Sequence, residues 1–130
     1  MFKESFSKNP VLKLSFDFSL SVISFCEGLE QERKFLLARQ LLRSGTSIGA
    51  HVVEAQNVES RAGFIHKFKI AAKEAEETAY WLLLSEYANH NPGCTELLAR
   101  VDVLNKVIGK IISTTRKRNP VSYLLSFLLV

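Results

Sequence analysis

The stretch LLRSGTSIGAHVVEAQ, residues 41–56, holds two glycines four positions apart, Gly45 and Gly49, among hydroxyl side chains. A phosphate-binding P-loop would need Lys followed by Ser or Thr after its last glycine, and a strand before its first. Here Ala50 and His51 follow Gly49, and ERKFLLARQLL, which favours a helix, precedes it. The motif therefore does not predict a phosphate-binding loop.

The same stretch carries a helical period that continues through both glycines. Small and apolar residues recur at spacings of three and four, which is the pattern of a heptad seam: Ala38, Leu41, Gly45, Ile48, Val52 and Ala55. Glycine inside a helix costs about 1 kcal/mol relative to alanine, so packing must offset that cost. We predict a helix in which Gly45 and Gly49 let a neighbouring helix come close.

Composition bounds the rest of the chain. Its 130 residues are 47% hydrophobic and 23% charged, which indicates one globular domain. Only 3 prolines and 6 glycines interrupt it, which favours helices over a many-stranded sheet. Cys26 and Cys94 have no motif spacing, so we expect reduced, partly buried thiols.

We predict an all-α domain at residues 1–119, an antiparallel up-down-up-down four-helix bundle with helices at about 10–28, 30–58, 60–89 and 95–118. The expected helix starts are Asn9 with Pro10, Ser60 and Thr95, and the expected stops are Gly28 and Asn119-Pro120. No run approaches the roughly 20 apolar residues of a membrane span, and no leader segment is evident, so we expect a cytoplasmic protein.

The uncharged segment VSYLLSFLLV follows the last helix, within residues 120–130. It is too short to span a bilayer. Three placements stay open for it: against its own bundle, against another subunit, or on a membrane surface.

Two of the expected helices are apolar on two faces, so each needs two partners. The first has one face with Val11, Leu14, Phe18, Phe25 and Leu29, and an opposite face with Leu12, Phe16, Leu20 and Ile23. The third has a seam of Phe64, Phe68, Ala71, Ala75, Thr78 and Leu82, and a second stripe of Ile70, Glu74, Glu77, Trp81, Leu84 and Ala88.

The second faces are either scattered surface residues or an oligomer interface, and the tryptophan favours the interface. The candidate interface is Leu12, Phe16, Leu20, Ile70, Glu74, Glu77, Trp81 and Leu84. Within it, Glu74 and Glu77 would pair with cations such as Arg43 or Lys73.

Charge gathers in the last helix. Residues 100–118 hold six cations, Arg100, Lys106, Lys110, Arg116, Lys117 and Arg118, against only Asp102. Lys106, Lys110 and Lys117 lie opposite a seam of Leu97, Val101, Leu104, Ile108, Ile111 and Thr115. For a single helix an ordinary solvated face explains this best, and the alternative is a surface that binds polyanions. No aromatic residue interleaves the cations, so sequence-specific reading of bases is not predicted.

Catalytic chemistry has little support in the sequence. His51-x-x-Glu54 is a single pair in the reverse order to the Glu-x-x-His motifs of carboxylate-bridged metal bundles. Glu74 and Glu77 have no nucleophile beside them. We expect no metal, no cofactor and no catalytic residue.

Two motifs in this order resemble the four-helix-bundle family of the 23S rRNA intervening-sequence proteins, related to the accessory variability determinants of diversity-generating retroelements. The first runs from Arg43 to Ala50 and continues at Glu54-Ala55, and the second comprises Lys73-Glu74-Ala75, Glu77-Thr78 and Trp81-Leu82. Two features depart from the family: His51, where it usually has Asn, and the apolar segment after Pro120.

The resemblance implies a small bacterial bundle that assembles as a ring, commonly a homopentamer, without enzymatic activity. The retroelement relatives bind nucleic acid and a reverse transcriptase through a basic surface. Two functions therefore stay open: a module that binds structured RNA or DNA through the last helix, or a protein-interaction scaffold whose basic face is incidental.

Overall fold

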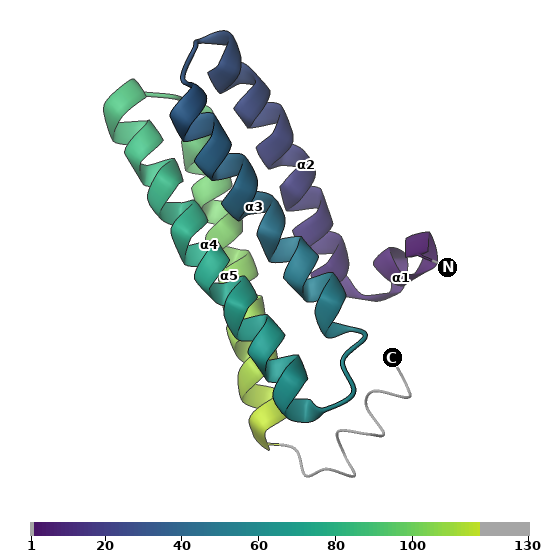
Figure 1. Cartoon of the computed structure of the whole chain (residues 1–130). Helices are drawn as coiled ribbons and strands as arrows, with labels where there is room; N and C mark the ends of the chain where they lie inside the picture. The colour runs from purple at the N-terminus through teal and green to yellow at the C-terminus, as the bar shows by residue number, and fades with distance from the viewer. Residues whose placement is uncertain (1, 118–130) are drawn as a thin grey trace.

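The computed structural model describes residues 2–117 and contains five helices (Figure 1). They are α1 (Phe2–Lys8), α2 (Pro10–Gln31), α3 (Phe35–Ala55), α4 (Arg61–Asn89) and α5 (Gly93–Lys117). Over this range no strand occurs, so the prediction of an all-α fold is confirmed. The predicted helix count missed α1.

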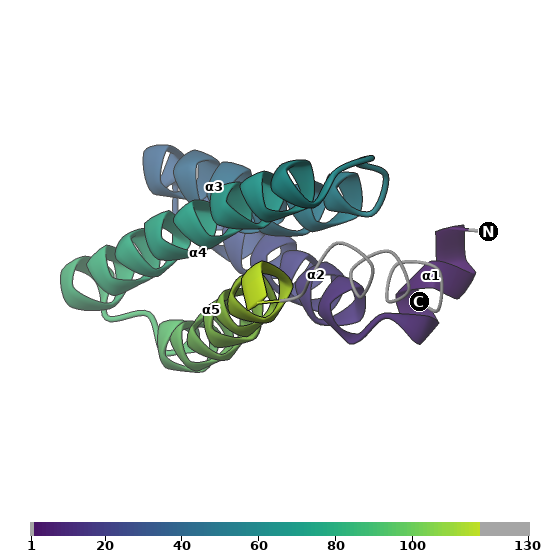
Figure 2. The same ribbon diagram turned by 90° about the horizontal axis from the view of Figure 1, so that it is seen from below.

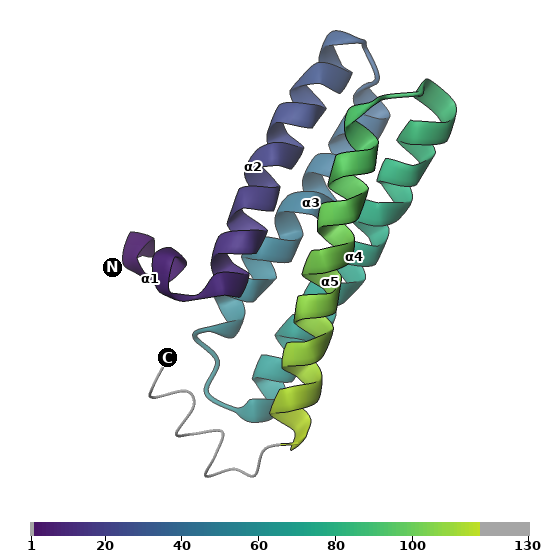
Figure 3. The ribbon, with the colours of Figure 1, turned by 180° about the vertical axis from the view of Figure 1, so that it is seen from behind.

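The four long helices lie alongside one another, and consecutive ones run in opposite directions (Figures 1 and 3). α3 packs extensively on both α2 and α4, and α4 packs on α5, whereas α2 and α5 contact each other less extensively. α1 lies beyond the long helices, next to the start of α2 (Figure 2). It is attached by Phe6, whose ring centroid is 4.8 Å from that of Phe16.

Two predicted helix starts are confirmed. The side chain of Asn9 accepts a hydrogen bond from the backbone N–H of Val11 at 3.2 Å, and Pro10 follows in the first turn of α2. The hydroxyl of Ser60 accepts from the N–H of Gly63 at 3.0 Å and caps α4.

Other predicted boundaries are wrong. Gly28 does not end α2, because the chain reverses later, at Arg33, which has a φ of 63°. α3 therefore begins at Phe35 rather than at residue 30, and it ends at Ala55 rather than at residue 58. α5 begins at Gly93, so Thr95 lies inside its first turn. The predicted end at residue 118, Asn119-Pro120 and the segment 120–130 lie outside the described residues.

The predicted seams of three helices form the core. Every member of the α3 seam is buried, and so are all members of the α4 seam except Phe64, which is half-buried. The α5 seam is likewise buried, except that Ile111 is half-buried. In α2 the predicted face is buried at Val11, Phe18 and Leu29, but two residues were placed wrongly, because Leu12 is 4% exposed and Leu14 is 42% exposed.

Buried small polar residues explain why Leu12 and Leu14 were placed wrongly. Its buried stripe runs through Ser15 and Cys26, which a count of hydrophobic residues undervalues. Ser15 satisfies its own hydroxyl by donating to the carbonyl oxygen of Leu12 at 3.1 Å. The buried stripe of α2 therefore lies closer to α3 than predicted and includes Leu12.

The predicted close approach at the two glycines is confirmed and is tighter at Gly45. A Cβ added at Gly45 would lie 2.8 Å and 2.9 Å from the two methyl carbons of Val22. A Cβ at Gly49 would lie 3.4 Å from the carbonyl oxygen and from the hydroxyl of Ser15, which is ordinary contact. α2 therefore packs against the α3 backbone itself at Gly45.

Candidate nucleic-acid interface

The outer face of α5 presents lysines to solvent. Lys106, Lys110 and Lys117 are exposed, and the buried seam lies on the opposite side of the helix. The Nζ of Lys106 pairs with Asp102 at 3.0 Å, but both side chains are more than 60% exposed, so the pair is weak. Among the described residues, no ionic partner is found for Lys110 or Lys117. We call Lys106, Lys110 and Lys117 the lysine face.

The last turn of α5 carries a second cation beside the lysine face. Arg116 and Lys117 occupy the last turn, where cations also interact favourably with the helix dipole. Both are exposed. Arg118, predicted to belong to the same surface, lies outside the described residues.

Arg100 is not part of this surface, which corrects the prediction. Its guanidinium donates a hydrogen bond to the hydroxyl of Ser21 in α2 at 2.7 Å and lies 5.7 Å from the centroid of the Phe18 ring. Arg100 is half-buried between the two helices. Arg100 therefore connects α5 to α2 through a hydrogen bond and a cation–π contact, and it is not available to a ligand of the lysine face.

The chemistry of the lysine face suits phosphate groups. An ammonium on a flexible stem is a compact point charge that contacts phosphate without a fixed geometry. α5 contains no aromatic residue on which a base could stack. Such a face would bind a polyanion through its backbone, with little discrimination between sequences.

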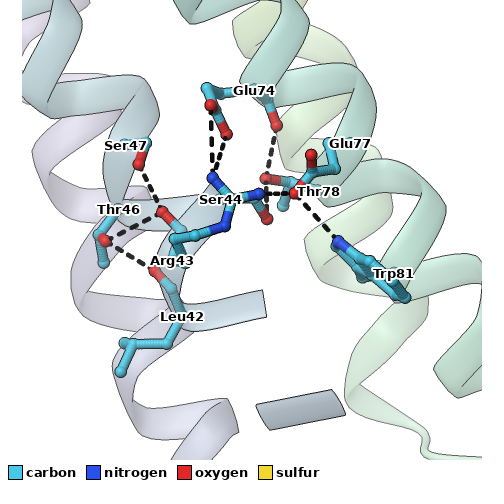
Figure 4. Close-up of polar contacts among 9 residues, drawn as sticks. All are labelled: Leu42, Arg43, Ser44, Thr46, Ser47, Glu74, Glu77, Thr78 and Trp81. Atoms are coloured by element: carbon cyan, nitrogen blue, oxygen red, sulfur yellow. Dashed lines mark hydrogen bonds and ion pairs between the residues drawn. The ribbon is translucent and has the colours of Figure 1, made fainter. Parts of the chain in front are cut away.

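A second polar cluster joins α3 to α4 (Figure 4). The guanidinium of Arg43 lies 3.3 Å and 3.5 Å from the two carboxylate oxygens of Glu74, and it also pairs with Glu77. The sequence predicted Arg43 as a partner of these glutamates, but within a subunit interface. The structure places all three residues in one chain, so the pairing needs no second subunit.

A buried hydroxyl pair lies beneath this cluster. The oxygens of Ser44 and Thr78 are 2.9 Å apart, and both residues are fully buried. Thr78 Oγ1 is also 2.7 Å from the carbonyl oxygen of Glu74, which can only accept. Thr78 therefore donates to that carbonyl and accepts from Ser44, which satisfies both hydroxyls and fixes the register of α3 on α4.

The predicted oligomer surface is only partly available. Leu12 belongs to the core, so it cannot contact a second subunit. Trp81 is half-buried and donates from its indole nitrogen to Glu77 at 3.2 Å. The residues left most exposed are Phe16 at 45%, Leu20 at 52% and Leu84 at 40%, while Ile70 is half-buried.

His51 and Glu54 lie beside Lys67, at the other end of the α3–α4 surface. Lys67 donates to Glu54 at 2.7 Å, and this hydrogen bond and the charge of the lysine lower the pKa of Glu54. His51 Nδ1 is 4.0 Å from the same carboxylate. Within residues 2–117 no group of three His, Cys, Asp or Glu side chains is placed to hold a metal ion.

Both cysteines are free and buried. Burial, and to a lesser degree the charge of Glu30, raises the pKa of the Cys26 thiol to about 11, and burial also raises that of Cys94. We therefore expect neither thiol to react with a thiol-specific reagent in the folded protein at pH 8, since the thiolate is the nucleophile. In denaturant both should react. Reaction of either thiol in the folded protein, at the rate seen in denaturant, would contradict this burial.

Within the described residues, no helix has the length and apolar character needed to cross a membrane.

The chain matches the model of a protein family described as 23S rRNA-intervening sequence protein, over residues 7–110. Among solved structures it is similar to a protein of unknown function from the S23 ribosomal protein family of Bacteroides thetaiotaomicron VPI-5482. The two share 38% sequence identity with a TM-score of 0.76, and the match covers 78% of this chain and 97% of that chain. No curated protein matches the sequence.

Proposed function

Because the chain belongs to the 23S rRNA-intervening sequence protein family, we propose that it is a non-enzymatic, oligomeric accessory protein of the cytoplasm that binds RNA or DNA through α5. The observation that carries this proposal is the lysine face. Its three side chains point to solvent, away from the seam. In a family named for rRNA genes, a polyanion is the natural partner of such a face.

One copy of the lysine face would bind weakly, because exposed ammonium groups are well hydrated and screened by salt. Assembly into a ring would present the face several times, and one long nucleic acid could contact many copies. Release of counterions from each neutralised phosphate would then make the affinity fall steeply with salt.

Apolar residues that are exposed or half-buried offer two surfaces for assembly. One is on α2, with Phe16, Leu20 and Ile23, and the other is on α4, with Trp81 and Leu84. We take the four long helices as an up-down-up-down bundle that carries these surfaces on different sides. Two different surfaces on one subunit give a head-to-tail contact, which closes into a ring when the rotation allows it. A homopentamer is the ring we propose.

Assembly predicts a complementation between two variants. Leu20→Glu and Trp81→Glu each place a charge in one of the two surfaces, so each variant alone should sediment as a monomer. A mixture should form heterodimers, because one pair of surfaces is intact in it. Leu36→Glu is the control, since Leu36 is 73% exposed and lies on α3, which carries neither surface. Rings that persist in both variants would contradict the assigned surfaces.

The alternative function is a protein-interaction scaffold, for example a partner of a reverse transcriptase, with no direct contact to nucleic acid. The polar cluster of Arg43, Glu74 and Glu77 favours it, since charges that are partly exposed and held in place suit recognition of another protein.

Light scattering with and without structured RNA, at several salt concentrations, separates the two functions. The proposal expects a ring that gains the mass of RNA at low salt and loses it at moderate salt. A ring that never gains mass, even at low salt, would favour the scaffold.

A further inference from the structure

The short helix α1 lies over one end of the apolar surface of α2. Phe16, Leu20 and Ile23 follow one another at spacings of four and three, so they share one side of the helix. They are 45%, 52% and 39% exposed. The ring of Phe6 in α1 contacts the first of them, with 4.8 Å between the ring centroids and 39° between the ring planes. α1 therefore covers the Phe16 end of the α2 surface.

The outward character of α1 is polar. Phe6 is half-buried, and it packs against the edge of the core as well as on Phe16. The other side chains of α1 that the structure describes are all exposed, and they are Lys3, Glu4, Ser7 and Lys8. α1 therefore presents polar groups to solvent at a place where it covers part of an apolar surface.

Asn9 and Pro10 separate α1 from α2. Proline disfavours a helical conformation in the residue before it, and Asn9 is extended, with a φ of −117° and a ψ of 107°. The side chain of Asn9 accepts from the N–H of Val11 and donates to Oε1 of Gln56 at 3.3 Å, beside the end of α3. Neither contact involves α1, so α1 can turn about this connection while the long helices stay packed.

A helix as short as α1 has little stability of its own. It has 7 residues, whereas isolated helices shorter than about 12–15 residues are marginal in water. Its position therefore depends on the packing of Phe6. An aromatic pair shifts an equilibrium constant by about 2- to 12-fold, which a larger apolar contact on the same surface exceeds.

We propose that α1 is an autoinhibitory lid on the α2 surface, an inference that rests on the proposed ring assembly. While α1 is docked, Phe6 occupies the side of Phe16 that a second copy of this chain needs. The neighbouring subunit must displace α1 to cover the whole surface, so the docked lid lowers the apparent affinity between subunits. Phe6 precedes residues 7–110, so the residue that holds the lid lies outside the range that the family model matches.

Sedimentation of the wild type and of Phe6→Ser, over a range of protein concentrations, tests the lid. Loss of the aromatic contact favours the open state, so the concentration at which half of the chains are assembled should fall by at least about twofold. Ser7→Ala is the matched control, because Ser7 is exposed on the same helix, and it should assemble like the wild type. Circular dichroism verifies that each variant keeps the fold.

The outcomes separate the lid from the ring itself. Equal assembly of the wild type and Phe6→Ser would overturn the lid and leave the ring in place. Weaker assembly of Phe6→Ser would also overturn it, because α1 would then contribute to the contact between subunits. If neither chain assembles at any concentration, the proposed ring fails, and the lid fails with it.

A spin label on α1 follows the lid directly. Ser7→Cys provides the attachment point, since Cys26 and Cys94 are buried. In a chain that also carries Trp81→Glu, which keeps the α2 surface and should stay monomeric, α1 stays docked and the label is partly immobilised. In the ring the spectrum should gain a mobile component, because the displaced α1 has lost its packing. A label that is equally or less mobile in the ring would contradict the lid.

Discussion

Replacing Gly45 by alanine is expected to lower the free energy of unfolding by up to about 2 kcal/mol, because overpacking costs about 1–3 kcal/mol and the gain in helix propensity returns only about 1 kcal/mol. The new Cβ would meet both methyl groups of Val22 at 2.8 Å and 2.9 Å. Val22 is fully buried and β-branched, so it cannot turn aside without strain. Gly45→Leu should be worse, to the point of preventing the native packing of α2 on α3.

Urea unfolding of matched variants measures this effect. Gly109→Ala is the control, since its Cβ would meet nothing within 4 Å in α5, and it should stabilise the protein by up to about 1 kcal/mol. Gly49→Ala should fall between the two, because its nearest contact is 3.4 Å. If Gly45→Ala stabilises the protein as much as Gly109→Ala does, α2 does not pack on the α3 backbone at this point.

A double variant isolates the contact. Val22→Ala removes the two methyl groups and should destabilise the wild type by leaving a cavity. In the Gly45→Ala background the same change should cost less, because it also relieves the overpacking. The two changes should therefore couple favourably, as residues in contact do. Strict additivity would show that Gly45 and Val22 act independently.

The sequence predicted the packing of α3, α4 and the α5 seam because each carries an apolar repeat with few exceptions. For the same reason the sequence predicted that a neighbouring helix comes close to Gly45 and Gly49, because the helical repeat of α3 continues through both glycines. Which glycine has the closer contact with α2 depends on the side chain that lies opposite it. Val22 opposes Gly45 and Ser15 opposes Gly49, and no pattern in the sequence pairs them.

The boundary errors came from local signals that tertiary structure overrides. Gly28 predicts the end of a helix, yet it lies inside α2. The residue with a left-handed conformation at the turn is Arg33. Glycine permits such a conformation without requiring it, and arginine adopts it here at some cost. The short α1 was missed because seven residues hold too few periods to detect.

The sequence predicted which residues belong to the candidate sites, but it did not predict which residues they contact. Arg100 belongs to the basic run of the sequence. Only the packing of α5 against α2 shows that its side chain lies against Phe18 and donates to Ser21. Arg43 was expected to meet Glu74 and Glu77 across subunits, whereas the register of α3 on α4 brings them together in one chain. Such pairings depend on the register between helices, which composition does not determine.

Reversing the charge of the lysine face is expected to abolish binding of structured RNA. Lys106→Glu, Lys110→Glu and Lys117→Glu together replace three attractive contacts with three repulsive ones in every subunit of the ring. The fold should be retained, because all three side chains are exposed and face away from the buried seam. Circular dichroism and the sedimentation of the ring would verify this.

A matched variant separates the lysine face from net charge. Lys13→Glu, Arg39→Glu and Lys69→Glu make the same change in charge at exposed positions of α2, α3 and α4. This control should weaken RNA binding only through the long-range field, which salt screens beyond about 10 Å at 0.1 M. Equal loss in both triple variants would mean that net charge, rather than α5, governs binding.

The most direct measurement of the central proposal is the salt dependence of RNA affinity, followed by fluorescence anisotropy of a labelled structured RNA. For the wild-type ring, the logarithm of the association constant should fall linearly with the logarithm of the salt concentration. Each phosphate neutralised by one lysine adds about 0.7–0.9 to the slope, so losing three contacts in one subunit should reduce it by about 2–3. Affinity and slope that are the same in the wild type and in the lysine-face variant would contradict the proposal that α5 binds nucleic acid.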